Sequence, residues 1–221
     1  MCASYGLDPR FPGYTDYRRG LISLVQLKKL AEWATSNDNA VVRPTGKNLR
    51  NLNPVFLQGG EFAEAWWGQI VGGQPAKFSC INTRLERVQA KPGLASKRVL
   101  IPASSWFEYQ DPAKTRYSMT SAEPFMLAGL RTSGRLADGS EFICYSIITG
   151  PPAPHLEVIH NRMPVMLPGD FFDDWIDPDA NGTPELIGAA IAASDRIEGS
   201  FTATLAPTPA KKKKAEPEAL F

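Results

Sequence analysis

RVLIPASSWFEYQ, residues 98–110, contains two short runs of β-branched and aromatic side chains, which favour β-strands. Comparable runs lie on both sides of it, separated by Gly-Gly, Pro-Gly and Asp-Gly turn signals: VFLQ (55–58), FAEAWWGQIV (62–71), AKFSCINTRLERV (76–88), PFMLAGLRT (124–132) and EFICYSIIT (141–149). So many short strands with short connections predict sheets that are mostly antiparallel.

Three segments outside these runs carry helical signals. Residues 20–36 space their apolar side chains at helical intervals, and 168–176 and 183–194 each open on Pro or Thr-Pro, which favours a helix start. We therefore predict one α+β domain over residues 1–204, with an open barrel-like core and peripheral helices. Residues 205–221, rich in Pro, Ala and Lys, are predicted to form a disordered tail.

The composition of the 221-residue chain is that of a soluble globular protein: 43% hydrophobic and 21% charged residues, with a net charge of +1. Binding to nucleic acid would therefore need a local basic patch. No signal peptide or membrane span is evident. The three cysteines (Cys2, Cys80 and Cys144) form no CxxC pair, which argues against structural zinc and suits a reducing cytoplasm. We expect a cytoplasmic protein without a cofactor.

Cys2 directly follows the initiator methionine. If Met1 is removed, Cys2 carries a free α-amine and a thiol, both with a usable nucleophilic fraction near neutral pH. Such a 1,2-aminothiol can condense with an aldehyde and close a thiazolidine ring, which an internal cysteine cannot do. Alternatively, Cys2 is only a small residue at a frayed terminus.

Glu108 and His160 are candidate acid–base groups. Glu108 lies in an aromatic run, where strand alternation leaves two options open: an inward carboxyl with a raised pKa, or a side chain on the wet face. His160, in VIHNRMP, could transfer protons near pH 7 or serve only as a structural hydrogen-bonding group.

Several other residues could contact a nucleic acid. If 81–87 is a strand, Asn82, Arg84 and Glu86 share one face, as the floor of a polar site or as a solvated surface with an Arg–Glu pair. Arg162 adds a guanidinium suited to phosphate. Trp66 and Trp67 point to opposite faces of a strand, so one could stack on a base unless both belong to the core.

In this order, MC at the start, WWG, INTRLE, IPASSWFE, SIIT and IHNRMP resemble the SOS-response-associated peptidase family over residues 2 to about 176. Departures are Ala3 and Ser4 after Cys2, Thr83 within the Asn-Thr-Arg stretch and Tyr109 after Glu108.

The resemblance implies a covalent sensor of abasic sites in single-stranded DNA, with Cys2 forming the thiazolidine crosslink. It implies that Asn82 orients the sugar and that Glu108 and His160 transfer protons. It also implies DNA contacts, through Arg84, Arg162, Trp67, Pro44 and Thr149.

Two other functions remain open. A cysteine autopeptidase would use Cys2 to attack the bond to a leader, although only Met1 precedes it and methionine aminopeptidase could do the same. A reversible single-stranded DNA binding module would not need Cys2. The tail ending Leu220-Phe221 is faintly similar to peptides that dock on the bacterial sliding clamp, and its Lys211–Lys214 run could instead touch DNA non-specifically. A cytoplasmic protein with such contacts would associate with the nucleoid.

Overall fold

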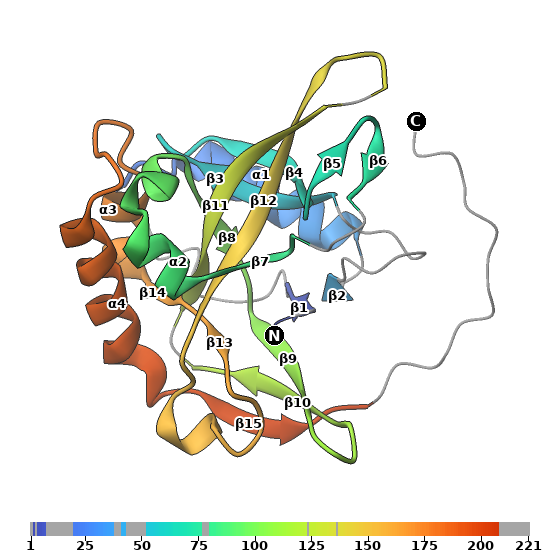
Figure 1. The fold of residues 1–221 in the computed structure, drawn as a ribbon, viewed down its shortest axis with the longest axis vertical. Coiled ribbons are helices and arrows are strands. Elements are labelled where there is room, and N and C mark those ends of the chain that lie inside the picture. The colour runs from blue at the N-terminus through green and yellow to red at the C-terminus, as the bar shows by residue number, and fades with distance from the viewer. Residues whose placement is uncertain are drawn as a thin grey trace.

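The computed structural model describes residues 2, 4–7, 20–37, 41–42, 52–76, 80–122, 124–135 and 137–207. Its centre is a five-stranded ring (Figure 1) in which β12 pairs with both β4 and β11 and so closes the sheet. The β12–β4 pair is parallel and the other four pairs are antiparallel. The ring strands are β3 (Leu52–Leu57), β4 (Phe62–Trp67), β8 (Arg98–Pro102), β11 (Phe125–Arg135) and β12 (Glu141–Gly150). The α+β fold and barrel-like core are as predicted.

Short strands extend this barrel. β7 runs parallel to β12, while β13 and β14 pair antiparallel with β12 and β11. A second sheet, antiparallel throughout, has the order β15-β10-β9-β1-β2, and β5 and β6 form a separate hairpin. The bounds of these strands are β1 (Tyr5–Gly6), β2 (Val41–Val42), β5 (Ile70–Val71), β6 (Gln74–Pro75), β7 (Asn82–Arg84), β9 (Ser105–Gln110), β10 (Thr115–Thr120), β13 (Met163–Pro164), β14 (Met166–Pro168) and β15 (Thr202–Leu205).

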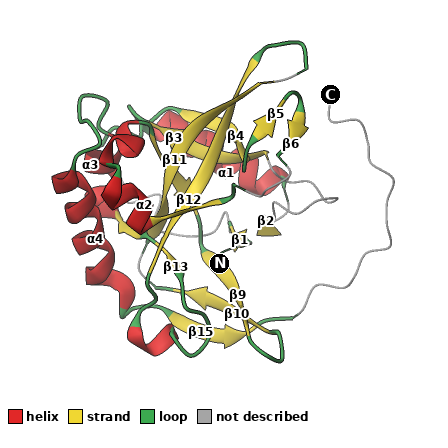
Figure 2. Ribbon diagram, viewed as in Figure 1, coloured by secondary structure: helices red, strands yellow, loops and turns green. Residues whose placement is uncertain are grey.

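Helices lie outside the barrel (Figure 2). The predicted C-terminal helix begins at Pro184, behind Thr183, whose hydroxyl accepts a hydrogen bond from the Leu186 amide. The α-helices are α1 (Leu24–Ser36), α2 (Leu85–Ala90), α3 (Phe172–Ile176) and α4 (Pro184–Glu198). The 3₁₀ turns are η2 (Pro92–Ser96), η3 (Pro154–Leu156) and η4 (Gly169–Phe171).

The expectation of one strand face carrying Asn82, Arg84 and Glu86 is wrong for Glu86. The strand ends at Arg84, and α2 begins at Leu85. Leu85 and Val88 stand three residues apart and are both buried, so the helical spacing lets both reach the core. Glu86 is thereby turned out of the strand.

Alternation along the strands divides the core in two. Val99 and Ile101 join the cluster inside the barrel, whereas Leu100 belongs to the cluster between the barrel and the helices. Both faces of β8 are therefore covered, and every one of its residues is buried. The interior cluster also includes Cys2, which places this residue at the barrel's core.

Candidate functional site

The N-terminal segment is fixed by backbone pairing. Tyr5 lies opposite Trp106 in the β1–β9 ladder, and the Phe107 amide donates to the Ser4 carbonyl across 3.0 Å. The Tyr5 hydroxyl bonds the Tyr145 hydroxyl of β12 at 2.8 Å inside the barrel. These contacts hold the chain beside β9 two residues after Cys2, so that segment does not fray in the described structure.

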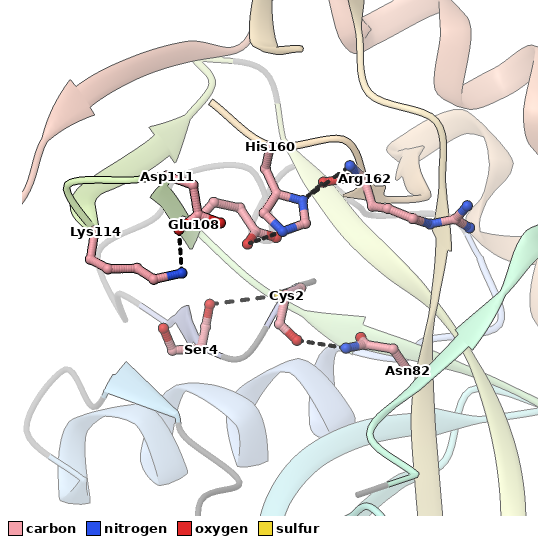
Figure 3. A network of polar contacts seen from close by, with 8 residues as sticks. All are labelled: Cys2, Ser4, Asn82, Glu108, Asp111, Lys114, His160 and Arg162. Atoms are coloured by element: carbon pink, nitrogen blue, oxygen red, sulfur yellow. Dashed lines mark hydrogen bonds and ion pairs between the residues drawn. The ribbon is translucent and has the colours of Figure 1, made fainter. Parts of the chain in front are cut away.

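Cys2 is buried and held at two atoms (Figure 3). Its carbonyl oxygen accepts a 2.8 Å hydrogen bond from the Asn82 side-chain amide, and its Sγ lies 3.7 Å from the Ser4 carbonyl oxygen. Burial, followed by the negative charge of Glu108, raises the pKa of the Cys2 thiol well above its usual range. The thiol is therefore protonated at neutral pH.

Glu108 faces inward on β9. It is only 2% exposed, which decides between the two orientations that the sequence left open. Burial raises the pKa of its carboxyl to about 7. A carboxyl with that pKa can both donate and accept a proton near neutral pH.

His160 lies in the turn between η3 and β13 and approaches Glu108. The distance from His160 Nε2 to Glu108 Oε2 is 3.9 Å. His160 Nδ1 lies 3.1 Å from the Arg162 backbone nitrogen and 3.2 Å from the Arg162 carbonyl oxygen, so these contacts orient the ring and are compatible with either neutral tautomer. Burial lowers the pKa of the ring, so the neutral form dominates at pH 7. The ring thus directs its Nε2 atom towards the Glu108 carboxyl.

The Arg162 guanidinium is engaged by Glu86 rather than standing alone. It makes a bidentate pair with the Glu86 carboxylate at 2.6 and 2.9 Å, and it also donates to the Thr149 carbonyl oxygen. These hydrogen bonds lower the pKa of Glu86 to about 2. Among the described residues, the buried Thr149 hydroxyl oxygen has no hydrogen-bond partner.

The other residues predicted to contact DNA differ in their exposure. Arg84 is exposed at the end of β7. Trp66 and Trp67 are both buried, the core option that the sequence left open. Trp67 stacks on Tyr145 and donates to the Ile81 carbonyl oxygen, so its ring offers no free face to a base in this structure. Pro44 and the Lys-rich tail lie outside the described residues.

Sequence reasoning missed two features of the site, the Tyr5–Tyr145 hydroxyl pair and Glu86 as the partner of Arg162. The paired residues are 140 and 76 positions apart, so no local motif connects them. Within the described part of the chain, no cluster of His, Cys, Asp and Glu could hold a metal ion, and no helix has the length and apolar character needed to cross a membrane.

Comparison with known proteins gives a consistent result. Residues 31–199 match the family described as SOS response associated peptidase (SRAP). Two relatives from Bacillus subtilis, the abasic site processing proteins YoqW and YobE, are each 32% identical over 127 residues, covering 53% of this chain. The match spans 56% of YoqW and 58% of YobE, so it covers little more than half of either relative.

Solved structures show the same fold. A protein from Bacteroides thetaiotaomicron superposes with a TM-score of 0.69 at 18% identity, covering 98% of this chain and 97% of the other. A phage-related protein from Bordetella bronchiseptica gives a TM-score of 0.59 at 21% identity, covering 94% and 95%.

Proposed function

The chain belongs to the SRAP family, and from that premise we propose that it captures abasic sites in single-stranded DNA as a covalent adduct on Cys2. One observation carries the proposal: Cys2 is held by Asn82 beside the facing pair Glu108 and His160. The relatives named abasic site processing proteins support the choice of substrate.

The reaction follows from the chemistry of an N-terminal cysteine. Once Met1 is removed, the Cys2 amine attacks the aldehyde of the ring-opened abasic sugar, and loss of one water gives an imine. The thiol then adds across the C=N bond, with sulfur bonding to carbon and the proton passing to nitrogen, which closes the thiazolidine. Groups held together in this way gain effective molarities of roughly 10⁵–10⁸ M.

Glu108 is suited to the proton transfers of this sequence. With a pKa of about 7, its carboxyl is protonated in part of the molecules at neutral pH. It can donate a proton to the departing hydroxyl during imine formation. As a carboxylate, it can then accept the proton of the Cys2 thiol, which burial keeps protonated.

His160 and Asn82 act beside it. The neutral His160 ring directs its Nε2 atom towards Glu108 and can assist ring opening of the sugar by proton transfer. Asn82 fixes the Cys2 carbonyl and thereby the direction of the amine. Its own side-chain oxygen is buried and, within the described residues, has no hydrogen-bond partner, which leaves it available to a sugar hydroxyl.

Phosphate contacts are assigned to the two arginines near the site. Arg84 is exposed, and Arg162 is oriented by its bidentate pair with Glu86, whose carboxylate is 57% exposed. Thr149 and Pro44 are further proposed DNA contacts. The Thr149 carbonyl oxygen accepts a hydrogen bond from Arg162, and the Thr149 hydroxyl has no partner among the described residues. Because Trp67 is covered by Tyr145, we do not propose that it stacks on a base.

The test is a denaturing gel of purified protein with a single-stranded oligonucleotide that contains one abasic site. Mass spectrometry first establishes that the protein begins at Cys2. We expect a heat-stable shifted band with wild type and none with Cys2→Ala. The exposed Cys80 provides a matched control, because Cys80→Ala removes a thiol without touching the site and should crosslink as wild type does.

Two further experiments distinguish imine formation, thiazolidine closure and reversible binding. Cys2→Ser keeps the amine, so borohydride should trap an imine although no thiazolidine forms. A tetrahydrofuran analogue of the abasic sugar has no aldehyde and should bind only reversibly. If a verified Cys2 terminus gives no adduct while reversible binding persists, the chain is a binding module and the covalent proposal fails.

A further inference from the structure

A second cleft lies outside the barrel, between the α2–η2 segment and the β11–β12 ribbon. Its volume is about 500 Å³. Thr83 and Ser146 stand on its floor and share a 2.7 Å hydrogen bond. Because Asn82 points to Cys2 and Thr83 is its neighbour in β7, alternation places this cleft on the opposite face of the strand from Cys2.

The charges lining this cleft are all positive. Arg87, Lys97 and Arg131 line it, and no acidic residue does. Within the described ranges none of the three takes part in an ion pair. Glu86, next to Arg87 in sequence, is occupied by Arg162. Three unneutralised cations around one hollow attract a polyanion.

The geometry also joins the cleft to the Cys2 site. Arg84 ends β7, and Arg87 follows one turn later on α2. Lys97 directly precedes β8, and its carbonyl oxygen accepts a hydrogen bond from the Arg131 amide of β11 at 2.9 Å, so these two residues are adjacent in space. Arg84, two residues after Asn82, therefore connects the edge of the Cys2 site in sequence with the three cations that line the cleft, and we call these four residues the basic track.

We propose that this cleft binds the phosphodiester backbone of the DNA strand that flanks the abasic site. The inference rests on the proposed function for its substrate, and it adds a second contact region on the far face of β7. Three spaced cations fit the repeating charge of a strand. The Thr83–Ser146 pair on the floor uses one hydroxyl proton internally and leaves the other for a phosphate or sugar oxygen.

The salt dependence of reversible binding tests the proposal. It is measured in a Cys2→Ala background, so that no crosslink forms and failure of the covalent chemistry leaves the result unaffected. The triple variant Arg87→Gln, Lys97→Gln, Arg131→Gln loses three contacts. For single strands the slope of log K against log salt should therefore fall by about 2 in magnitude. Lys29→Gln, an exposed lysine on α1, is the matched control and should keep the full slope.

The length of the oligonucleotide distinguishes binding along the basic track from a general effect of the lost positive charge. The reduced slope should appear with an oligonucleotide of about 20 nucleotides and not with one of about four, which is too short to span both faces. An unchanged slope with the long strand, or an equal loss with both strands, would overturn the proposal. Thermal melting of the triple variant at the wild-type temperature establishes that the fold is intact.

Cys80 gives an independent readout because it lines the cleft and is exposed, whereas Cys144 is buried. In the same Cys2→Ala background, alkylation counted by mass spectrometry therefore reports on the cleft. The long strand should slow alkylation of Cys80, and the short strand or inorganic phosphate should not. Equal protection by inorganic phosphate would identify a small-anion site, and no protection by the long strand would leave the cleft without DNA; either result contradicts the proposal.

Discussion

Replacing Glu108 by Gln should stabilise the protein at alkaline pH while it slows crosslinking. The pKa of the Glu108 carboxyl rises from 4.5 to about 7 on folding because burial disfavours the charged form. The folded state then holds a proton more tightly than the unfolded state. Stability from this group is therefore fully present below pH 4.5 and is lost as the pH rises through 7.

The magnitude follows from that shift. Each unit of pKa difference corresponds to about 1.4 kcal/mol, and over the window from pH 5 to pH 8 the loss amounts to about 2.5 kcal/mol. Glu108 is almost fully buried, so solvent screening reduces this figure little. Gln is nearly isosteric and cannot ionise. The free energy of unfolding of Glu108→Gln should therefore gain about 2.5 kcal/mol relative to wild type between those pH values.

The assay is urea unfolding of both proteins at several pH values between 5 and 8. Titrating groups distant from Glu108 are common to both proteins and cancel in the difference, and a His160→Gln background removes the contribution of the ring 3.9 Å from the carboxyl. Glu86→Gln is the control, because hydrogen bonds with Arg162 lower the pKa of Glu86 to about 2, whereas burial raises the pKa of Glu108. Glu86 stays ionised throughout the window, so the difference between Glu86→Gln and wild type should not vary with pH.

This prediction is refuted if the free energies of unfolding of wild type and Glu108→Gln differ by a constant amount from pH 5 to pH 8. A constant difference would mean that the carboxyl does not titrate in this window. It would then be unsuited to donate and accept protons at neutral pH, which would contradict its proposed role in the capture of the abasic site.

Three further predictions concern other residues. His160→Gln should slow crosslinking roughly 100-fold, measured on gels of reactions stopped at timed intervals. Its affinity for DNA with the tetrahydrofuran analogue, measured by fluorescence anisotropy, should be unchanged. Asn82→Leu leaves the buried Cys2 carbonyl unpartnered, so the crosslinking rate should fall and urea unfolding should show a loss of about 1–3 kcal/mol. Arg98→Met should cost about 3 kcal/mol or more in urea unfolding, because the buried guanidinium donates to four main-chain carbonyl oxygens.

Local pattern predicted the architecture well because it depends on periodicity and turns. The runs around 98–110 became β8 and β9, and the Thr-Pro signal at 183–184 opened α4. The period-two pattern gave a wrong prediction at Glu86. It extended the strand over residues 81–87, whereas the chain forms a helix from Leu85 onward, in which both Leu85 and Val88 are buried.

The site was only partly predictable, for a physical reason. Alternation cannot tell which face of β9 is covered. Glu108 shares a face with the buried Trp106, and this face is covered by the cluster that also contains Cys2. Trp66 and Trp67 are both buried because β4 belongs to a closed barrel with both faces covered. The Tyr5–Tyr145 contact depends on tertiary pairing alone.

The most direct test of covalent capture by Cys2 is mass spectrometry of the crosslinked protein after digestion with trypsin and nuclease. We expect that the peptide of residues 2–10, without Met1, carries the sugar–phosphate remnant with the loss of one water and resists reduction by borohydride. An adduct on a lysine, or a peptide that retains Met1 together with the adduct, would contradict this expectation.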